Sequence, residues 1–199
     1  MKSVNTLVKQ TWAGLRVLIV MTVLLGILYP LAVWAIARIP GLESNAEGSV
    51  VTQNGQAAGS SLIGVDPVPA DPARDPWFHT RPSAATAEMP SGASNKGPYN
   101  EDLVKAIQER RAAIAQREGV SPDQVPPDAV TASGSGLDPA ISVAYADLQA
   151  ARVAKNTGLS PDRVKQLIEA NTSGAGIGVP GVNVLPLNLA VQAAAGGAH

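Results

Sequence analysis

Residues 17–37 read VLIVMTVLLGILYPLAVWAIA and contain no charged side chain, although Arg16 precedes them and Arg38 follows them. As a helix that rises ~1.5 Å per residue, a run of this length spans roughly the ~30 Å hydrocarbon layer of a bilayer. No second apolar run in the sequence approaches this length. The sequence therefore predicts one transmembrane helix, residues 15–37, after a short N-terminal tail, residues 1–14.

Pro30 lies inside this run, where it removes one backbone hydrogen-bond donor and favours a kink. We expect a partner helix to pack there, against Tyr29 and Pro30. A cleaved signal peptide is the alternative interpretation, since Ala35-Ile36-Ala37 fits the small-x-small pattern that signal peptidase accepts. Signal-peptide apolar regions are usually ~7 to 15 residues long, however, and this run is longer. Both interpretations export the same domain.

The basic residues near the run set its expected orientation. Lys2, Lys9 and Arg16 precede it, whereas only Arg38 lies close behind it. Because positive charge favours the cytoplasmic side, we expect a cytoplasmic N-terminus and place residues 38–199 outside the plasma membrane. That part has 12 Lys and Arg against 16 Asp and Glu, a net charge of −4, which argues against a nucleic-acid partner.

The exported part is expected to be an α+β domain with about three helices and a small β-sheet made of an N-terminal hairpin and a late strand. Asn54-Gly55 favours a tight turn between two short strands, Ser49–Gln53 and Gly59–Val65. Residues 66–98 contain seven prolines. Proline removes the backbone donors that a sheet needs, so this segment is expected to be irregular and extended.

Capping residues in front of helical patterns predict where the helices of this domain begin. Asn100 is expected to cap a helix that runs from Glu101 to near Gly119. Further helix starts are predicted at Ser121-Pro122, Asp138-Pro139 and Ser160-Pro161, with helices over Pro139–Asn156 and Pro161–Ala170 and a final strand over Val182–Val191, in which Pro186 marks an edge or a bulge.

The most distinctive loop is TASGSGLDP, residues 131–139, which leads onto one of these predicted helix starts. The Walker spacing with its lysine is absent, and so are the preceding strand and the third glycine of the dinucleotide fingerprint. A structural turn is the favoured interpretation. The alternative is an anion site built from backbone N–H groups, with the candidate residues Thr131, Ser133, Gly134, Ser135, Gly136 and Asp138.

Few residues of the chain offer chemistry for catalysis. Cysteine is absent, which excludes disulfide bonds, thiolate catalysis and cysteine-ligated metals. A serine nucleophile needs a base, and only His79 and His199 are available, so we expect neither catalytic residues nor a metal site. A membrane-tethered hydrolase that acts through Ser133 or Ser135 is a distant alternative, and a free-standing ligand-binding module is another.

The proline-rich segment carries side chains that suit a partner interface. Trp77 and Phe78 lie in a region that is not expected to form its own core, so they either fill the core of the domain or bind a partner. Arg81 can stack on an aromatic ring or pair with an acid across an interface, and a solvated loop arginine is the equal alternative. We predict that Trp77, Phe78 and Arg81 belong to a partner interface, together with Tyr29 and Pro30 of the helix.

Short blocks with distinctive sequences occur along nearly the whole chain: Tyr29-Pro30, GSSLIG (59–64), RPSA (81–84), SN (94–95), GPYN (97–100), TASGSGLDP (131–139), Gln149, RVA (152–154) and VNVL (182–185). These blocks resemble one family, the C subunit of the Kdp potassium-transporting P-type ATPase, which acts in bacterial potassium uptake. The chain departs from the usual pattern at Val65, Trp77 and Ala140, where the family has glutamine, tyrosine and histidine.

The resemblance implies a non-catalytic accessory subunit of the bacterial inner membrane, with its main domain in the periplasm or outside the cell. The implied partners are a channel-like potassium-translocating subunit, a P-type ATPase subunit, a small single-helix subunit and membrane lipid. The family is also described as a chaperone that raises the ATP affinity of the pump subunit. This role would make the loop of residues 131–139, the serine-glycine loop, a nucleotide contact. ATP is cytoplasmic, whereas the charge bias places this loop outside, so ATP as a cofactor rests on the resemblance alone.

Overall fold

The computed structural model describes residues 2–174 and 179–196, and the chain divides into two compact units at Ser49 and Val50. His199, one of the two candidate bases, lies outside the described residues. So does part of the glycine-rich loop that precedes the predicted final strand, residues 175–178.

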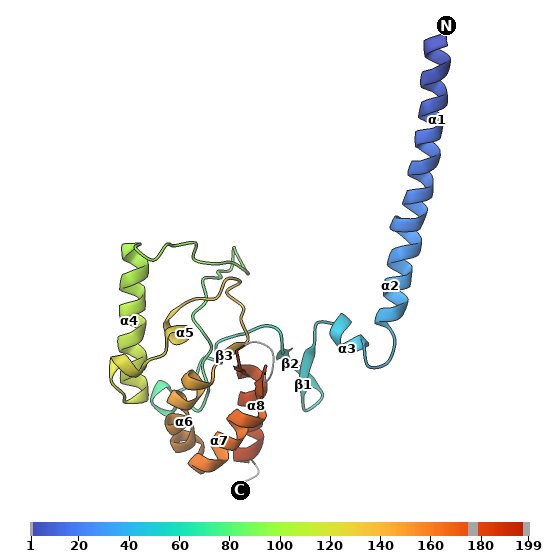
Figure 1. The fold of residues 1–199 in the computed structure, drawn as a ribbon. Coiled ribbons are helices and arrows are strands. Elements are labelled where there is room, and N and C mark those ends of the chain that lie inside the picture. Colours follow the sequence, from blue (N-terminus) through green and yellow to red (C-terminus); the bar gives the residue numbers. More distant parts are fainter. Residues whose placement is uncertain (1, 175–178, 197–199) are drawn as a thin grey trace. The chain divides into compact units, whose positions relative to one another are not determined.

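The first unit is dominated by one long helix (Figure 1). Its part from Val4 to Ala37 is long and apolar enough to cross a membrane, and none of it is buried within the chain. The predicted tail, residues 1–14, is helical from Lys2 onward, so the helix is longer than the apolar run. The elements are α1 (Lys2–Val23), a π-helical turn (Leu24–Leu28), α2 (Tyr29–Ala37) and the short α3 (Glu43–Ala46).

The π-helical turn directly precedes Pro30. There the N–H group of Tyr29 donates to the carbonyl of Leu24, five residues back, instead of the usual four. Proline has no N–H group, and its ring collides with the carbonyl four residues earlier in a regular helix. The wider turn makes room for the ring, so the irregularity expected at Pro30 takes the form of a π turn.

The second unit opens with the predicted hairpin, β1 (Val50–Gln53) and β2 (Gln56–Ser60). Asn54 and Gly55 form the turn with φ values of 52° and 78°, the left-handed conformation that this residue pair favours. The second strand was predicted too late, from Gly59. A two-residue turn brings the chain straight back into register, so Gln53 already pairs with Gln56.

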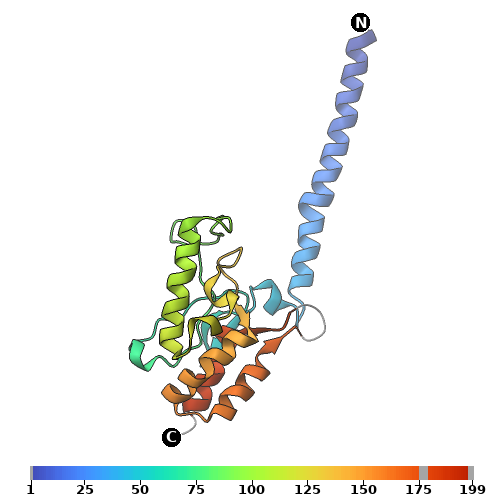
Figure 2. The same ribbon diagram turned by 60° about the vertical axis from the view of Figure 1, so that its left-hand side comes forward.

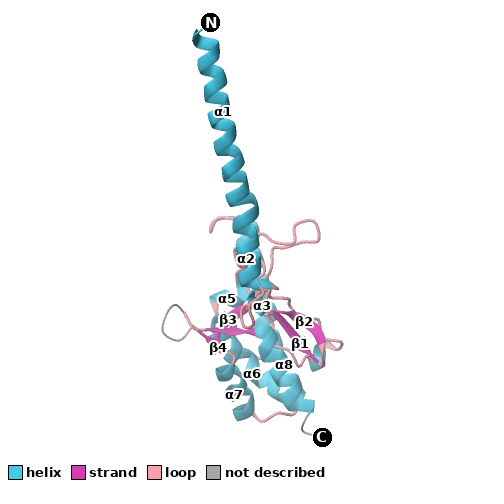
Figure 3. Ribbon diagram, turned by 90° about the vertical axis from the view of Figure 1, so that its right-hand side faces the viewer, coloured by secondary structure: helices cyan, strands magenta, loops and turns pink. Residues whose placement is uncertain are grey.

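A three-stranded antiparallel sheet and a group of helices form the rest of this unit, which confirms the α+β class. The elements are α4 (Glu101–Glu118), α5 (Pro127–Val130), β3 (Ala140–Ser142), α6 (Val143–Thr157), α7 (Pro161–Ala170), β4 (Thr172–Ser173), β5 (Gly181–Asn183) and α8 (Val184–Gly196), with 3₁₀ turns at Pro72–Arg74 and Pro122–Gln124. The strand order is β3-β5-β4, so the hairpin is not part of this sheet, as Figure 3 shows. Helices α6, α7 and α8 pack together (Figure 2).

Two predicted helix starts are wrong. Ser121-Pro122 begins only a 3₁₀ turn. The helix predicted from Pro139 begins four residues later, because the intervening residues pair with β5 as strand β3. Its cap is Ser142, whose hydroxyl accepts a hydrogen bond from the N–H of Tyr145 at 3.0 Å. The starts at Asn100 and Ser160 are confirmed by the same type of bond.

The predicted final strand is also wrong beyond Asn183, where the chain turns into α8. Pro186 lies in the first turn of this helix, where a missing N–H group costs nothing. Val184, Leu187 and Val191 are buried, and their spacing of three and four residues is helical. A strand would have turned these side chains to both faces.

Phe78 has no solvent exposure and belongs to the core together with side chains from α6, α7 and α8. Of the two roles open to it, Phe78 fills the core, so it is withdrawn from the predicted partner interface. Its neighbour Trp77 is half-buried and remains a candidate. The rest of residues 66–98 contains no helix or strand apart from the 3₁₀ turn, as the prolines predicted.

Candidate functional site

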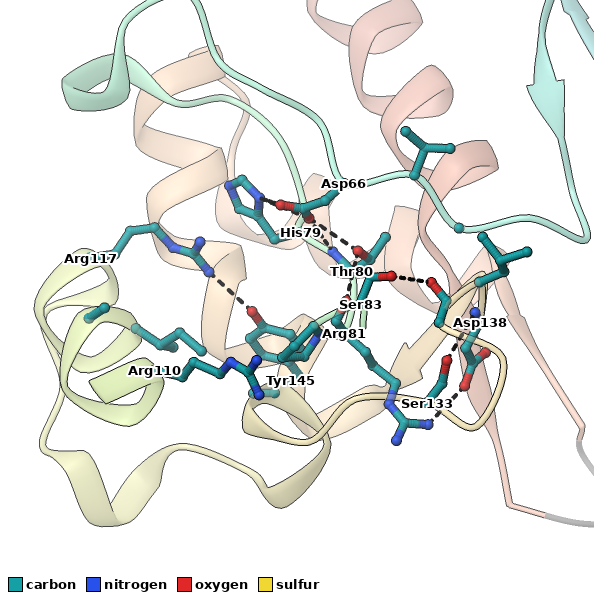
Figure 4. Close-up of a pocket in the computed structure, with 18 residues that line it drawn as sticks. Asp66, His79, Thr80, Arg81, Ser83, Arg110, Arg117, Ser133, Asp138 and Tyr145 are labelled. Atoms are coloured by element: carbon teal, nitrogen blue, oxygen red, sulfur yellow. Dashed lines mark hydrogen bonds and ion pairs between the residues drawn. The ribbon is translucent and has the colours of Figure 1, made fainter. Parts of the chain in front are cut away.

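Three segments that are far apart in the sequence meet around one cavity of about 440 Å³ (Figure 4). They are residues 64–66 after the hairpin, residues 79–83 of the proline-rich segment, and the serine-glycine loop between residues 133 and 138. Each segment includes part of one of the blocks that resemble the Kdp family. The other wall comes from α4 and α6, with Arg110, Arg117 and Tyr145.

The serine-glycine loop, residues 131–139, is held in place through its carbonyl oxygens. The hydroxyl of Ser83 donates to the carbonyl of Gly136 at 2.7 Å. The N–H group of Gly92 donates to the carbonyl of Ser135, also at 2.7 Å. Both donors belong to the proline-rich segment, so these bonds tie the two segments together.

The N–H groups at the end of this loop donate within the loop itself. Leu137 N–H donates to the hydroxyl of Ser135 at 3.1 Å, and Asp138 N–H donates to the hydroxyl of Ser133 at 3.4 Å. The loop then enters strand β3, not a helix N-terminus. An anion cradle requires N–H groups that converge on open space, so this geometry favours the structural turn. Of the other candidates, Gly134 is exposed and the Thr131 hydroxyl donates to Pro127.

Close backbone contacts explain two glycines of the site. A Cβ atom on Gly64 would overlap the carbonyl oxygen of Asp138, and the N–H group of Gly64 donates to the carbonyl of Leu137 at 2.9 Å. Gly136 has a φ of +72°, and a Cβ there would lie 2.9 Å from the hydroxyl oxygen of Ser83. Only glycine fits at both positions.

Arg81 joins the proline-rich segment to the serine-glycine loop. Its guanidinium pairs with the carboxylate of Asp138 at 2.8 Å and donates to the carbonyl of Thr131 at 3.4 Å. The side chain of Arg81 is about a quarter exposed. The structure thus brings this predicted interface residue and the loop together and gives Arg81 an acidic partner within its own chain.

A buried ionic cluster lies behind the proline-rich segment. The guanidinium of Arg152 on α6 contacts the carboxylate of Asp75 at 2.8 Å and that of Glu118 at 3.0 Å. The side chains of Asp75 and Glu118 are 2% and 0% exposed. Arg152 also donates to the carbonyl of Trp77 at 2.9 Å. Arg152 therefore contacts both buried carboxylates and fixes the chain on either side of Pro76, while Arg117 also pairs with Glu118, at 2.6 Å.

Two buried amide side chains hold the backbone of Phe78 and His79. Asn188 accepts a hydrogen bond from the N–H of Phe78 at 2.8 Å and donates to its carbonyl at 2.9 Å. Gln149 does the same for His79, at 2.8 and 3.3 Å. The two amides supply the backbone hydrogen bonds that a neighbouring strand would otherwise make, because the prolines keep this segment out of a sheet.

His79 is enclosed by acids and is not directed at a serine. Its Nδ1 lies 3.1 Å from both carboxylate oxygens of Asp66, and its Nε2 lies 2.7 Å from Asp75. Both ring nitrogens are thus engaged, and a base for Ser133 or Ser135 would need one of them free. His79 is therefore not placed to act as the base that the hydrolase alternative requires.

Burial and neighbouring charges shift the pKa values of three side chains at the cavity, Tyr145, Arg117 and Asp66. Burial raises the pKa of Tyr145 above its ordinary value, although the neighbouring Arg117 acts in the opposite direction. Burial lowers the pKa of Arg117, but the opposing effects of Tyr145 and Glu118 are larger together, so the net shift is upward. Burial raises the pKa of Asp66, whereas hydrogen bonds and charge from His79 and Thr80 lower it, and the net shift is downward.

Asp66→Asn is therefore expected to reduce the free energy of unfolding at neutral pH. A carboxylate whose pKa is depressed by folding stabilises the protein fully above its ordinary pKa of 3.8, and this contribution disappears as the pH falls through the lower value in the folded state. The effect is modest because the Asp66 side chain is 56% exposed. Urea unfolding of the purified protein across a pH series measures it.

Asp147→Asn is the matched control, because Asp147 is an exposed acid on α6. We expect this control to match the unaltered protein throughout. A difference for Asp66→Asn that persisted or grew in acid would contradict the role assigned to the carboxylate.

Sequence reasoning missed the ionic cluster and the two buried amides. One signal was present: Gln149 follows Tyr145 and precedes Val153 at four-residue spacing, so it lies on the apolar face of α6. A polar side chain at such a position requires a buried hydrogen-bond partner. The identity of that partner depends on how the proline-rich segment crosses α6, which local patterns do not specify.

Together the fold and the site define the class of protein, an α+β domain attached to a single apolar helix of membrane-spanning length. A folded α+β unit with its own core follows one exposed apolar helix of membrane-spanning length. The charged side chains at the cavity mostly bind one another, so the residues that meet there hold the segments of the domain together.

Comparison with known proteins identifies the family within this class. The model of the family "KdpC: K+-transporting ATPase, c chain" matches residues 11–193, and the chain belongs to this family. A potassium-transporting ATPase KdpC subunit of Kineococcus radiotolerans is 47% identical over 199 residues, covering 97% of this chain and 98% of the relative. KdpC subunits of Streptomyces avermitilis and Mycobacterium tuberculosis are 40% and 43% identical, covering 96% and 92% of this chain and 96% and 98% of those relatives.

Proposed function

We propose that this protein is a non-catalytic accessory subunit that assembles and stabilises the pump and potassium-translocating subunits of an ATP-driven potassium-uptake complex. The observation that carries the proposal is the helix Val4–Ala37, whose apolar side chains find no cover within the chain. Membership in the KdpC family supports it, because the names of the relatives describe a subunit of a potassium-transporting ATPase.

The proposed topology is a single crossing of the bacterial inner membrane with the N-terminus in the cytoplasm. Lys2, Lys9 and Arg16 supply positive charge before the apolar run. Behind the run, Arg38 pairs with Glu47 at 2.9 Å and lies 3.7 Å from Glu43, so the local basic charge there is neutralised. The α+β unit is then outside the cytoplasm.

The proposed partners are the channel-like potassium-translocating subunit, the P-type ATPase subunit and the small single-helix subunit of the complex. Trp77, which is half-buried, is the candidate for contact on the α+β unit, where it lines a groove together with Thr157 and Val191. With the proposed topology, any effect on ATP affinity passes through the membrane helix, because cytoplasmic ATP does not reach the serine-glycine loop.

Deletion of this chain from its host tests the proposal. We expect loss of growth in potassium-limited medium together with reduced amounts of the pump and potassium-translocating subunits in the membrane. Complementation with the full chain should restore both, whereas residues 38–199 exported with a cleavable signal peptide should not. Normal levels and normal growth without the chain would contradict the accessory role.

A further inference from the structure

The π-helical turn in the long helix leaves a backbone carbonyl without its helical donors. In a regular helix the carbonyl of Leu25 accepts from the N–H of Tyr29, but that N–H donates to Leu24 instead. The donor one position later would be residue 30, which is proline and has no N–H group. The carbonyl of Leu25 therefore receives no hydrogen bond from the N–H group four residues later or from the position five residues later.

The position of this turn makes the loss important. Leu24–Leu28 lies in the middle of the uncharged run Val17–Ala37, so in the proposed membrane topology it is near the centre of the hydrocarbon layer. Water and lipid headgroups do not supply donors there, and a backbone group without a hydrogen-bond partner is strongly unfavourable in hydrocarbon. The carbonyl of Leu25 therefore needs a donor from another protein segment.

Gly26 gives such a segment room to approach. A Cβ atom at Gly26 would have only the Thr22 methyl group near it, at an ordinary contact distance of 3.8 Å. The missing side chain therefore serves no packing purpose within the chain itself. Small residues at helix crossings allow two backbones to come close, and polar side chains then bond across the interface.

We propose that the turn Leu24–Leu28 is the contact point for a transmembrane helix of another subunit, which crosses at Gly26 and donates a side-chain hydrogen bond to the carbonyl of Leu25. A hydroxyl or amide donor, from serine, threonine, asparagine or glutamine, has the required chemistry. The proposal rests on the proposed function, and it specifies where the membrane helix meets its neighbour and through which atom.

Gly26→Leu tests the crossing. A leucine fits the isolated helix, because its Cβ would make only that ordinary contact with Thr22, but it fills the space that the partner helix occupies. We expect recovery of the other subunits with the affinity-tagged full-length chain, after extraction in mild detergent, to fall by about tenfold or more. Gly14→Leu is the matched control, since nothing lies within 4 Å of a Cβ at Gly14, and it should leave recovery unchanged.

A photo-crosslinking amino acid at position 22, whose side chain lies beside Gly26 on the same face of the helix, tests the location independently, with position 24 as the control on the opposite face. We expect a crosslink to a partner subunit from position 22 and a much weaker one from position 24. Crosslinking only to a second copy of this chain, or full subunit recovery with Gly26→Leu, would overturn the proposal. Failure of the unaltered chain to recover any subunit would instead contradict the proposed function.

Discussion

Arg152→Ala is expected to lower the free energy of unfolding of the α+β unit by about 3–5 kcal/mol, the cost of removing one partner from a buried ion pair. The substitution removes the guanidinium of α6 from two buried carboxylates, so Asp75 keeps the imidazole of His79 beside it and Glu118 keeps Arg117. It also removes the donors to the carbonyls of Asp75 and Trp77. Urea unfolding of the purified protein, followed by tryptophan fluorescence, measures the loss.

Arg163→Ala is the control for this experiment, because Arg163 is an exposed arginine on α7 whose guanidinium bonds to Gln166. We expect it to change stability by no more than about 0.5 kcal/mol. Arg152→Lys keeps the charge but loses the planar fork, so its stability should fall between that of the unaltered protein and that of Arg152→Ala. Equal stability of the two alanine variants would show that the buried cluster contributes nothing.

Gly64→Ala is expected to destabilise the same unit by about 2–3 kcal/mol, in the range seen when extra atoms are forced into a packed interior. The added methyl group overlaps the carbonyl oxygen of Asp138. A backbone atom cannot move aside as a flexible side chain can, so the hydrogen bond from Gly64 to Leu137 must lengthen or break. The hairpin segment and the serine-glycine loop then separate.

Gly134→Ala in the same loop provides the comparison. Gly134 is exposed, and nothing lies within 4 Å of a Cβ at this position. We expect a change of less than about 0.5 kcal/mol in the urea midpoint analysis. If Gly64→Ala were as stable as Gly134→Ala, the close approach of the two segments would be absent in solution.

The features predicted correctly from the sequence are those that local chemistry decides. The apolar run requires one long exposed helix, the pair Asn54-Gly55 requires a tight turn, and the side chains of Asn100 and Ser160 accept hydrogen bonds at helix starts. Each depends on residues that are neighbours in the chain. Their geometry is therefore independent of how the rest of the chain folds.

The errors arose where tertiary contacts outweigh local preference. Asp138 before Pro139 has the sequence of a helix cap, but pairing of Ala140–Ser142 with β5 moves the helix start to Val143. The run after Asn183 is rich in β-branched and large apolar residues, yet its burial follows helical spacing. Choosing between strand and helix there requires knowing which side chains face the core.

The candidate site was predicted only in part. The residues of the serine-glycine loop and Arg81 were singled out, and the structure places them in contact through Asp138. Their predicted roles, as anion site or partner interface, remain predictions. Asp75, Glu118 and Arg152 were not foreseen as a cluster, because 43 residues separate the first from the second and 34 the second from the third.

Affinity purification of the tagged chain from the membranes of its native, potassium-starved host, in mild detergent, tests the subunit assignment most directly. We expect the P-type ATPase subunit and the channel-like potassium-translocating subunit to be recovered with the intact chain in constant proportion. Recovery of the intact chain alone, while those subunits are present in the same membranes, would contradict the assignment and favour an independent membrane-anchored domain.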